Sequence, residues 1–357
     1  MRRVSLEKLK KDCCLARTIY DVDGNVLLAE GVILKKHMIN KLLRYGITEV
    51  FVEDETSKDI QISDPISYNT RIDVKQKVKN ALARYNSCGI FDSDEVQEIV
   101  SKILDEMFED DEIAYNLAEI KKIDEYSFSH SVNVCVLSLL IAMNKDWQLN
   151  DLKLLGTAAL LHDVGKIKID GHIINKNSIL TQEEFEAVKK HCLYGYEMLA
   201  HIPCLDKTAA LVAMSHHERI DGSGYPFGLK GENIHSYSKI VSIADVYDAL
   251  TSDRIYRKKV KAKDVYHYIV SSSGRLFDEE YAASFSECVA IYPGGTTVKL
   301  NTGHIGIVVK VRRKNVERPI VRIVTDRNGK RIDKTYDVDL LQECEFEIVD
   351  SLEYIVN

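Results

Sequence analysis

The sequence predicts a multidomain, mainly α-helical protein: an all-helical bundle with a small α+β module before it and a small β-rich module after it. Three observations predict this class. Apolar residues recur every three and four positions from about residue 110 to 290, which is typical of packed amphipathic helices. The first 60 residues mix strand and helix patterns. The last 65 residues contain short apolar runs separated by turn residues.

The N-terminal module is predicted to contain strands at Leu15–Tyr20, 26–29 and Glu49–Glu53. Met38–Tyr45 has helical spacing, and Gly46 is a suitable residue to end that helix. A receiver domain is excluded, because its doubly wound fold needs about twice this length. The module is therefore expected to be a small α+β unit.

The remaining boundaries follow from changes in composition along the chain. A polar stretch around Pro65 predicts a linker, and helical spacing resumes at about 71–86 and 93–108. The predicted domains are 1–60 (α+β module), 61–115 (linker and helices), 116–291 (helical catalytic domain) and 292–357 (β-rich module).

Charge and hydropathy exclude several classes of function. Lys and Arg number 48 against 55 Asp and Glu, which gives a net charge of −7. Such a chain is poorly suited to bind a nucleic acid polymer or an anionic membrane. The longest near-apolar run, Val134–Met143, is far shorter than the roughly 20 residues of a membrane span. The eight cysteines are scattered without a CxxC pair, so we expect reduced thiols and a cytoplasmic protein.

Histidine and aspartate residues recur through the predicted bundle in a pattern that suits a metal site. The candidate ligands are His130, His162, Asp163, His191, His216, His217 and Asp245. The intervals between successive groups are 32, 29, 25 and 28 residues, each enough for roughly two antiparallel helices and their loop. One ligand group per hairpin then recurs at one level of the bundle. Imidazole and carboxylate donors suit iron, manganese, cobalt, nickel or zinc, and a carboxylate can bridge two ions.

Two neighbouring segments have the composition of a phosphate-ligand site. Asp221–Pro226 is rich in glycine, so its backbone can approach a ligand closely, and Lys230 follows it. Arg254 and Arg257 belong to a basic patch, and guanidinium groups match the geometry of phosphate oxygens. Alone, each segment would be an ordinary loop or helix end.

The motif His162-Asp163-Val164-Gly165-Lys166, with His216-His217-Glu218 and then Asp221–Pro226, resembles the HD-GYP subgroup of HD-domain phosphohydrolases. The resemblance runs from about Asp124 to Tyr292, roughly half of the chain. It implies a metal-dependent phosphodiesterase that hydrolyses cyclic di-GMP to pGpG, to GMP or to both. The seven candidate ligands match the metal ligands of that family.

The resemblance also implies roles for individual residues. Asp163 matches a bridging carboxylate, and Lys166 matches a lysine near the scissile phosphate; both are expected to be catalytic. The residues expected to contact the substrate are Asp221, Gly222, Lys230, Asp248, Arg254 and Arg257. Some family members hold a third metal through a Glu one helical turn before the first ligand. Here that position is Tyr126, with Glu125 out of register, so two divalent ions are expected. Iron or manganese is the first expectation, with nickel, cobalt and zinc as alternatives.

Other functions stay open at this point. The chain could be an HD-type hydrolase of another nucleotide, such as 3′,3′-cyclic GMP-AMP. It could be a non-catalytic receptor for cyclic di-GMP, although the ligand set is complete. It could also act as an interaction protein, with a homodimer contact or a signalling partner at the N-terminal module.

Overall fold

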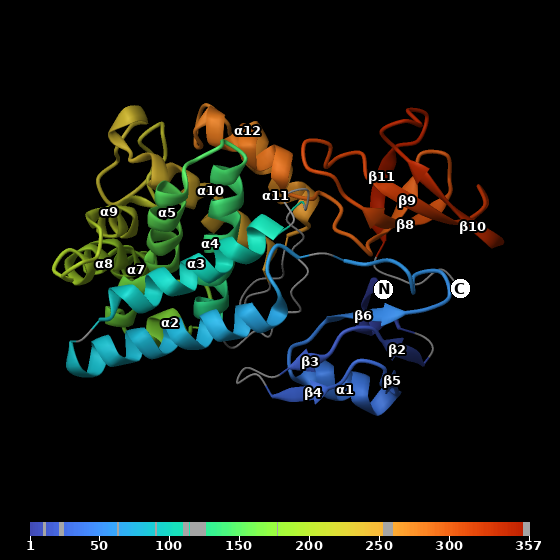
Figure 1. Cartoon of the computed structure of the whole chain (residues 1–357), viewed down its shortest axis with the longest axis horizontal. Coiled ribbons are helices and arrows are strands. Elements are labelled where there is room, and N and C mark those ends of the chain that lie inside the picture. The colour runs from blue at the N-terminus through green and yellow to red at the C-terminus, as the bar shows by residue number, and fades with distance from the viewer. Residues whose placement is uncertain are drawn as a thin grey trace. The chain divides into compact units, whose positions relative to one another are not determined.

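The computed structural model describes residues 1–9, 12–20, 25–62, 64–89, 91–109, 114, 126–176, 178–252 and 260–352; at 68, 86 and 126–128 it describes the backbone alone. The chain divides into two compact units (Figure 1). Unit 1 comprises Met1–Pro65, Glu112–Asp124 and Val289–Asn357, and unit 2 comprises Ile66–Asp111 and Glu125–Cys288. The mainly helical class, with small sheets near both ends of the sequence, is confirmed. The four domain boundaries stay a prediction.

The N-terminal part of unit 1 is built on a four-stranded antiparallel sheet in the order β1-β6-β2-β5. Its strands are β1 (Arg2–Ser5), β2 (Cys13–Leu15), β5 (Ile33–Leu34) and β6 (Glu49–Glu53), with helix α1 (Lys36–Arg44) between the last two. Val4 lies opposite Val50, and both side chains are buried in the core beneath α1 residue Leu42.

The predicted strand Leu15–Tyr20 is wrong in one respect, because the chain bends after Leu15 and the run divides in two. Its first part belongs to β2, and its second part is β3 (Ile19–Tyr20), which pairs with β4 (Val26–Leu28) in a separate two-stranded sheet. A continuous apolar run therefore serves two sheets, which its composition alone does not reveal.

The C-terminal part of unit 1 is a five-stranded antiparallel sheet in the order β10-β9-β8-β7-β11. Its strands are β7 (Thr297–Leu300), β8 (Ile305–Lys310), β9 (Ile320–Thr325), β10 (Arg331–Asp339) and β11 (Ile348–Leu352). The segment before Pro65, which was predicted to be a linker, packs against this sheet. Ile60 is buried with Ile307 and Val324, because its apolar side chain faces the sheet although its neighbours are polar.

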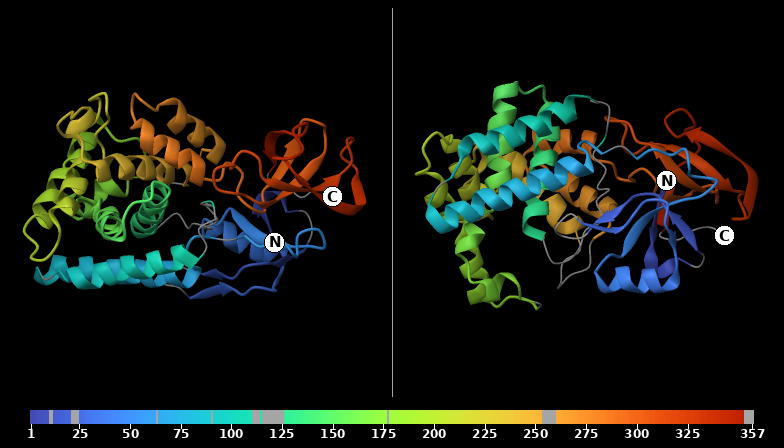
Figure 2. Two further views of the ribbon diagram at one scale, coloured as in Figure 1. Left: turned by 45° about the horizontal axis from the view of Figure 1, so that its top comes forward. Right: turned by 60° about the horizontal axis from the view of Figure 1, so that its bottom comes forward.

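Unit 2 contains the remaining helices. They are α2 (Tyr68–Cys88), α3 (Ser93–Glu109), α4 (Tyr126–Met143), α5 (Leu149–Leu161), η3 (Val164–Lys168), α6 (Gly171–Ile174), α7 (Gln182–Lys189), α8 (His191–Leu199), α9 (Lys207–Ser215), η4 (Gly231–Asn233), α10 (Ser236–Thr251), α11 (Ala262–Ser271) and α12 (Glu279–Cys288). Figure 2 shows α2 and α3 lying side by side, as their predicted spacing required. Ser67 begins α2 by accepting a hydrogen bond from Thr70 N, and Gly89, in the left-handed region, ends it.

Helix α4 lies at the centre of unit 2 and packs against α2, α5, α10 and α12. Its residues from His130 to Ala142 are all buried, as expected of a helix that is apolar on every face. This packing places His130 of α4 between the end of α5 and the middle of α10, where the other candidate ligands lie. Among the helices described, none combines the length and the apolar character needed to span a membrane.

Candidate metal centre

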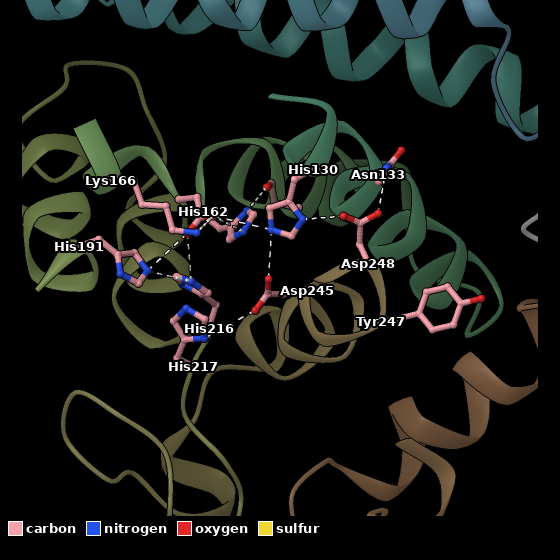
Figure 3. Close-up of polar contacts among 12 residues, drawn as sticks. His130, Asn133, His162, Lys166, His191, His216, His217, Asp245, Tyr247 and Asp248 are labelled. Carbon is pink, nitrogen blue, oxygen red and sulfur yellow. Dashed lines mark hydrogen bonds and ion pairs between the residues drawn. The ribbon is translucent and has the colours of Figure 1, made fainter. Parts of the chain in front are cut away.

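The seven predicted ligands come together in unit 2 (Figure 3). They are His130 of α4, His162 and Asp163 after α5, His191 at the start of α8, His216 and His217 after α9, and Asp245 of α10. His130 Nε2 lies 3.1 Å from Asp245 Oδ1 and 3.7 Å from Asp163 Oδ2. His191 Nε2 and His216 Nε2 lie 3.4 Å apart. Six of the seven are less than one-tenth exposed, and His217 is half-buried.

Local helix geometry orients three of these imidazole rings. In each, Nδ1 lies within hydrogen-bond distance of a backbone carbonyl in the turn before it. The pairs are His162 with Ala159 (2.8 Å), His191 with Val188 (2.6 Å), and His216 with Val212 and Ala213 (both 3.1 Å). A carbonyl can only accept, so Nδ1 carries the proton and the lone pair stays on Nε2. The Nε2 atoms point into the centre, where a metal ligand needs them.

Asp163 lies among these rings. Its Oδ1 is 3.4 Å from His191 Nε2, and its Oδ2 is 3.5 Å from His162 Nε2. Lys166 Nζ donates a hydrogen bond to the same Oδ2. Burial alone would raise the pKa of Asp163, but the positive charge of Lys166 and the nearby imidazoles hold it well below the usual range. Asp163 is therefore an ionised carboxylate that offers one oxygen to each side of the centre.

Three of the histidines, His162, His191 and His217, have the charge state that metal binding needs. Burial lowers the pKa of His162 to about 3 and that of His191 to about 4. Burial also lowers the pKa of His217 well below its ordinary value. Each ring is neutral near pH 7, so its free nitrogen can donate an electron pair to a cation.

Buried polar atoms show that the residues fit divalent cations. Within the described residues, His162 Nε2 and Asp163 Oδ1 are buried and have no hydrogen-bond partner. Leaving such atoms unsatisfied costs free energy, which a bound cation would offset. Three overlapping groups offer donor atoms within 4.8 Å of one another. These groups are His130, His162 and Asp245; His162, Asp163 and His216; and His191, Cys192, His216 and His217.

Cys192 is a donor that the sequence did not single out. Its side chain is fully buried, and its Sγ lies 3.5 Å from His191 Nε2. The only feature of the sequence that could have indicated this donor is its position next to the candidate ligand His191. The scattered spacing of the cysteines gave no such indication. The structure adds this thiol to one of the candidate donor groups.

The glycine-rich loop after His217 is held by a buried carboxylate. Glu218 is 2 % exposed, and its two oxygens accept hydrogen bonds from Phe227 N (2.8 Å) and Leu229 N (3.0 Å). Tyr225 of this loop stacks on the His217 ring, with centroids 4.6 Å apart. The loop thus supports a ligand from behind, as outer residues of metal sites commonly do.

Three predicted substrate residues lie together on this loop. Asp221 forms an isolated bridge with Lys230, and a Cβ on Gly222 would lie 2.5 Å from Lys230 Cε. In the part of the chain that the structure describes, no hydrogen bond or ion pair joins them to the seven ligands. Their contact with a substrate stays a prediction.

Asp248, a predicted substrate residue, lies beside the ligand His130. It is 1 % exposed; its Oδ2 lies 2.7 Å from His130 Nδ1, and its Oδ1 accepts from Asn133 Nδ2 at 2.9 Å. Asp248 thus supports the ligand His130. Its contact with a substrate stays a prediction.

Other predicted positions lie outside the described residues. Arg254 and Arg257 are among them, as are Glu125 and the side chain of Tyr126, on which the expectation of two ions depended. Lys166 is described, and its side chain is 28 % exposed beside the buried Asp163.

Comparisons with known proteins agree with this site. Residues 112–281 match the HD domain, and residues 297–354 match a KOW domain associated with the HD domain. A cyclic di-GMP phosphodiesterase of Pseudomonas aeruginosa is 34 % identical over 241 residues, which is 67 % of this chain and 58 % of that protein. One of Borreliella burgdorferi is 31 % identical over 211 residues, 58 % of this chain and 55 % of that protein.

A third relative is named for a different substrate. A 3′3′-cGAMP-specific phosphodiesterase of Vibrio cholerae is 33 % identical over 168 residues, 47 % of this chain and 36 % of that protein. Among solved structures, an HDG"Y"P protein from Bdellovibrio bacteriovorus aligns with a TM-score of 0.47 and 16 % identity, over 80 % of this chain and 97 % of that one.

The fold and the site define a helical HD-domain protein with a buried centre of histidine and aspartate that can hold divalent metal. Residues 112–281 of the chain belong to the HD-domain family. The chain spans just over half the length of the first curated relatives that it matches.

Proposed function

We propose that the chain is a metal-dependent phosphodiesterase that hydrolyses cyclic di-GMP to pGpG, to GMP or to both. The observation that carries the proposal is the complete, buried set of His and Asp donors with Lys166 at its edge. Relatives named as cyclic di-GMP phosphodiesterases support the substrate class. A receptor without activity is less well supported, because no ligand position is lost.

Two divalent ions would be held by His130, His162, Asp163, His191, His216, His217 and Asp245, with Asp163 between them. When bound, such ions supply a water of lowered pKa and stabilise charge on phosphate oxygens. Burial keeps His162 and His191 neutral, and their Nδ1 hydrogen bonds orient the rings. It also keeps bulk water away from the donor atoms, since their side chains are buried.

Lys166 is the group best placed to act on the substrate directly. Its ammonium donates to Asp163, and its side chain is partly exposed, so it can turn toward a phosphate oxygen beside the centre. A donor at that position stabilises the negative charge that develops on phosphorus oxygens during hydrolysis. We assign Lys166 and Asp163 as catalytic residues within this proposal.

The donor atoms indicate a class of metal ion and not a single metal. Imidazole and carboxylate donors suit iron or manganese, which we propose first, and also nickel, cobalt and zinc. The Cys192 thiol adds a softer donor on one side of the centre.

A second substrate is favoured by one observation. The relative named as 3′3′-cGAMP-specific is about as similar as those named for cyclic di-GMP. Both ligands are cyclic dinucleotides with two phosphates, so the same centre could serve either. We also propose a cytoplasmic location for the chain. We propose the N-terminal module as the place where a second copy or a signalling partner binds.

The test is a double replacement, His162→Ala with Asp163→Ala, assayed against cyclic di-GMP and 3′3′-cGAMP. Turnover should fall below detection for both while the helical circular dichroism is kept. His201→Ala is the matched control, because His201 is an exposed histidine outside the centre. Hydrolysis by the double variant at the wild-type rate would contradict the proposal. If the wild type hydrolyses 3′3′-cGAMP but not cyclic di-GMP, the proposed substrate would be 3′3′-cGAMP in place of cyclic di-GMP.

A further inference from the structure

We propose that Arg71 and Asn133 are positioning residues for the metal centre, which hold Asp248 so that His130 presents Nε2 to an ion. This inference rests on the proposed function, because it concerns an ion held by His130. Figure 3 shows Asp248 between His130 and Asn133, with Asp245 at the other nitrogen of the His130 ring. Arg71 continues this row of side chains on helix α2.

Three short contacts connect Arg71 to the ligand. Arg71 Nη1 donates to Asn133 Oδ1 at 2.7 Å. Asn133 Nδ2 donates to Asp248 Oδ1 at 2.9 Å. Asp248 Oδ2 lies 2.7 Å from His130 Nδ1. The far nitrogen of His130, Nε2, then lies 3.1 Å from Asp245 Oδ1 at the metal centre.

The chemistry of the side chains fixes the direction of every contact. A guanidinium can only donate, so the amide of Asn133 must turn its oxygen toward Arg71. Its NH₂ group then faces Asp248 and donates. An ionised carboxylate can only accept, so His130 carries its proton on Nδ1. The lone pair of His130 is thereby left on Nε2, which faces the centre.

Burial makes this arrangement specific. Arg71 is 6 % exposed, Asn133 and Asp248 are each 1 % exposed, and His130 is 1 % exposed. Polar groups shielded from water must satisfy one another, and a wrongly oriented member would leave buried atoms without partners. The three contacts together therefore favour the arrangement that suits a metal ligand.

His130 has a different partner at Nδ1 from its neighbours. His162, His191 and His216 point Nδ1 at a carbonyl of their own helix. His130 instead uses a carboxylate from α10, and the row continues to α2, which packs on α4. Arg71 precedes residues 112–281, which match the HD domain. The position of α2 therefore affects how His130 is oriented at the metal centre.

The experiment titrates manganese(II) into metal-free protein by calorimetry and compares the two binding events. Asn133→Asp keeps the acceptor for Arg71 but replaces the donor to Asp248 with a second carboxylate oxygen. Arg71→Met keeps a long apolar side chain but removes the first donor. In both variants the ion that His130 holds should bind roughly 10- to 100-fold more weakly, which is the usual effect of losing an outer partner. The ion held by His191, His216 and His217 should keep its wild-type affinity.

Two further variants separate positioning from general stability. Asn144→Asp is the matched control, because Asn144 Nδ2 also donates to a carboxylate, Glu287, at 2.9 Å, but outside the centre. It should leave both affinities unchanged. Arg71→Lys keeps a cationic donor and should restore most of the lost affinity.

The outcomes are distinguishable. Unchanged affinities in Asn133→Asp and Arg71→Met, or an equal loss of both ions, would overturn the positioning role while leaving the metal centre in place. A wild-type protein that binds no manganese(II) would overturn the proposed function itself.

Discussion

At the scale of single residues, Asp163 is the carboxylate on which the side chains of the metal centre converge. Four imidazole nitrogens and one ammonium lie within 4 Å of its two oxygens. The opposite charges around it keep the carboxylate ionised although it is buried. Lys166 is the one cationic side chain of this group. Because it is not a metal donor, replacing it tests the reaction of the substrate without removing a ligand of the metal.

We predict that Lys166→Met lowers kcat by about 10²- to 10³-fold, the usual effect of removing one donor to a developing negative charge. Metal content should be kept, because Lys166 is not a donor to the ions. The measurement is the turnover of cyclic di-GMP alongside metal analysis of the same sample. Lys166→Arg is the control and should recover part of the rate. An unchanged kcat in Lys166→Met would remove the residue from the mechanism.

Sequence could predict that the seven candidate ligands lie close together, because histidine and aspartate are costly to bury and recur at hairpin intervals in an apolar bundle. It could not predict the place of Asp248. Helical spacing says that Asp248 shares a face with Asp245, but it does not say whether that face meets substrate or another helix. Only packing against α4 shows that its partner is His130. Asn133 and Cys192 were missed for the same reason.

At the scale of elements, the centre depends on the close approach of η3 to α8. A Cβ at Gly165 would lie 2.0 Å from His191 O and 2.4 Å from Gly195 N. Both of those atoms belong to backbone, which cannot move aside as a flexible side chain can. Glycine at 165 thus lets the His162-Asp163 turn lie against the helix that begins with His191.

We predict that Gly165→Ala pushes α8 away and weakens the centre. The free energy of unfolding should fall by about 1–3 kcal/mol, as overpacking commonly costs. The affinity for manganese(II) should fall as well, because His191 moves. Gly171→Ala is the control, since its Cβ would meet only Asn175 Nδ2, at 3.8 Å. Thermal unfolding with and without manganese(II) measures both effects, and identical behaviour of the two variants would contradict this role of Gly165.

The elements themselves were largely predictable. The two helices expected at about 71–86 and 93–108 are α2 and α3, since their caps and apolar spacing agree. The prediction is wrong where one apolar run contributes to two sheets, as in the predicted strand that divides between β2 and β3. The partner of β2, strand β6, is distant in sequence, so the local pattern does not specify that pairing.

At the scale of the whole molecule, unit 1 joins the two ends of the sequence in one compact body. Arg322 of β9 lies 2.5 Å from Asp59 and 2.7 Å from Asp337. Arg2 of β1 is buried and pairs with Asp54 at 2.5 Å. The contact of Arg322 with Asp59 could not be predicted, because the whole of the helical bundle separates these two residues in the sequence.

Unit 1 should lose stability in acid through Asp54. Burial alone would raise the pKa of Asp54, but Arg2 and hydrogen bonds from Thr56 and Ser57 lower it below the ordinary value of 3.8. A carboxylate with a depressed pKa stabilises the fold above its unfolded value and loses that contribution as the pH falls through its folded value. The wild type should therefore lose stability in unit 1 below about pH 4.

We predict that Asp54→Asn lowers the stability of unit 1 by about 1–3 kcal/mol near pH 7 and flattens its acid dependence. The single tryptophan, Trp147, lies in unit 2, so its fluorescence does not report on unit 1. Hydrogen exchange of β1 and β6 amides, corrected for the intrinsic rate at each pH, is the suitable measurement. The exposed Asp333 provides the control, Asp333→Asn. Equal acid dependence of wild type and Asp54→Asn would contradict the assignment.

The central claim is that the buried His and Asp centre is a two-ion site for hydrolysing a cyclic dinucleotide. The most direct test is metal content and cyclic di-GMP turnover measured on one anaerobically purified sample. We predict two equivalents of a divalent transition metal, iron or manganese first, with release of pGpG or GMP. Metal-replete protein that hydrolyses neither cyclic di-GMP nor 3′3′-cGAMP, or protein that binds no metal, would contradict the claim.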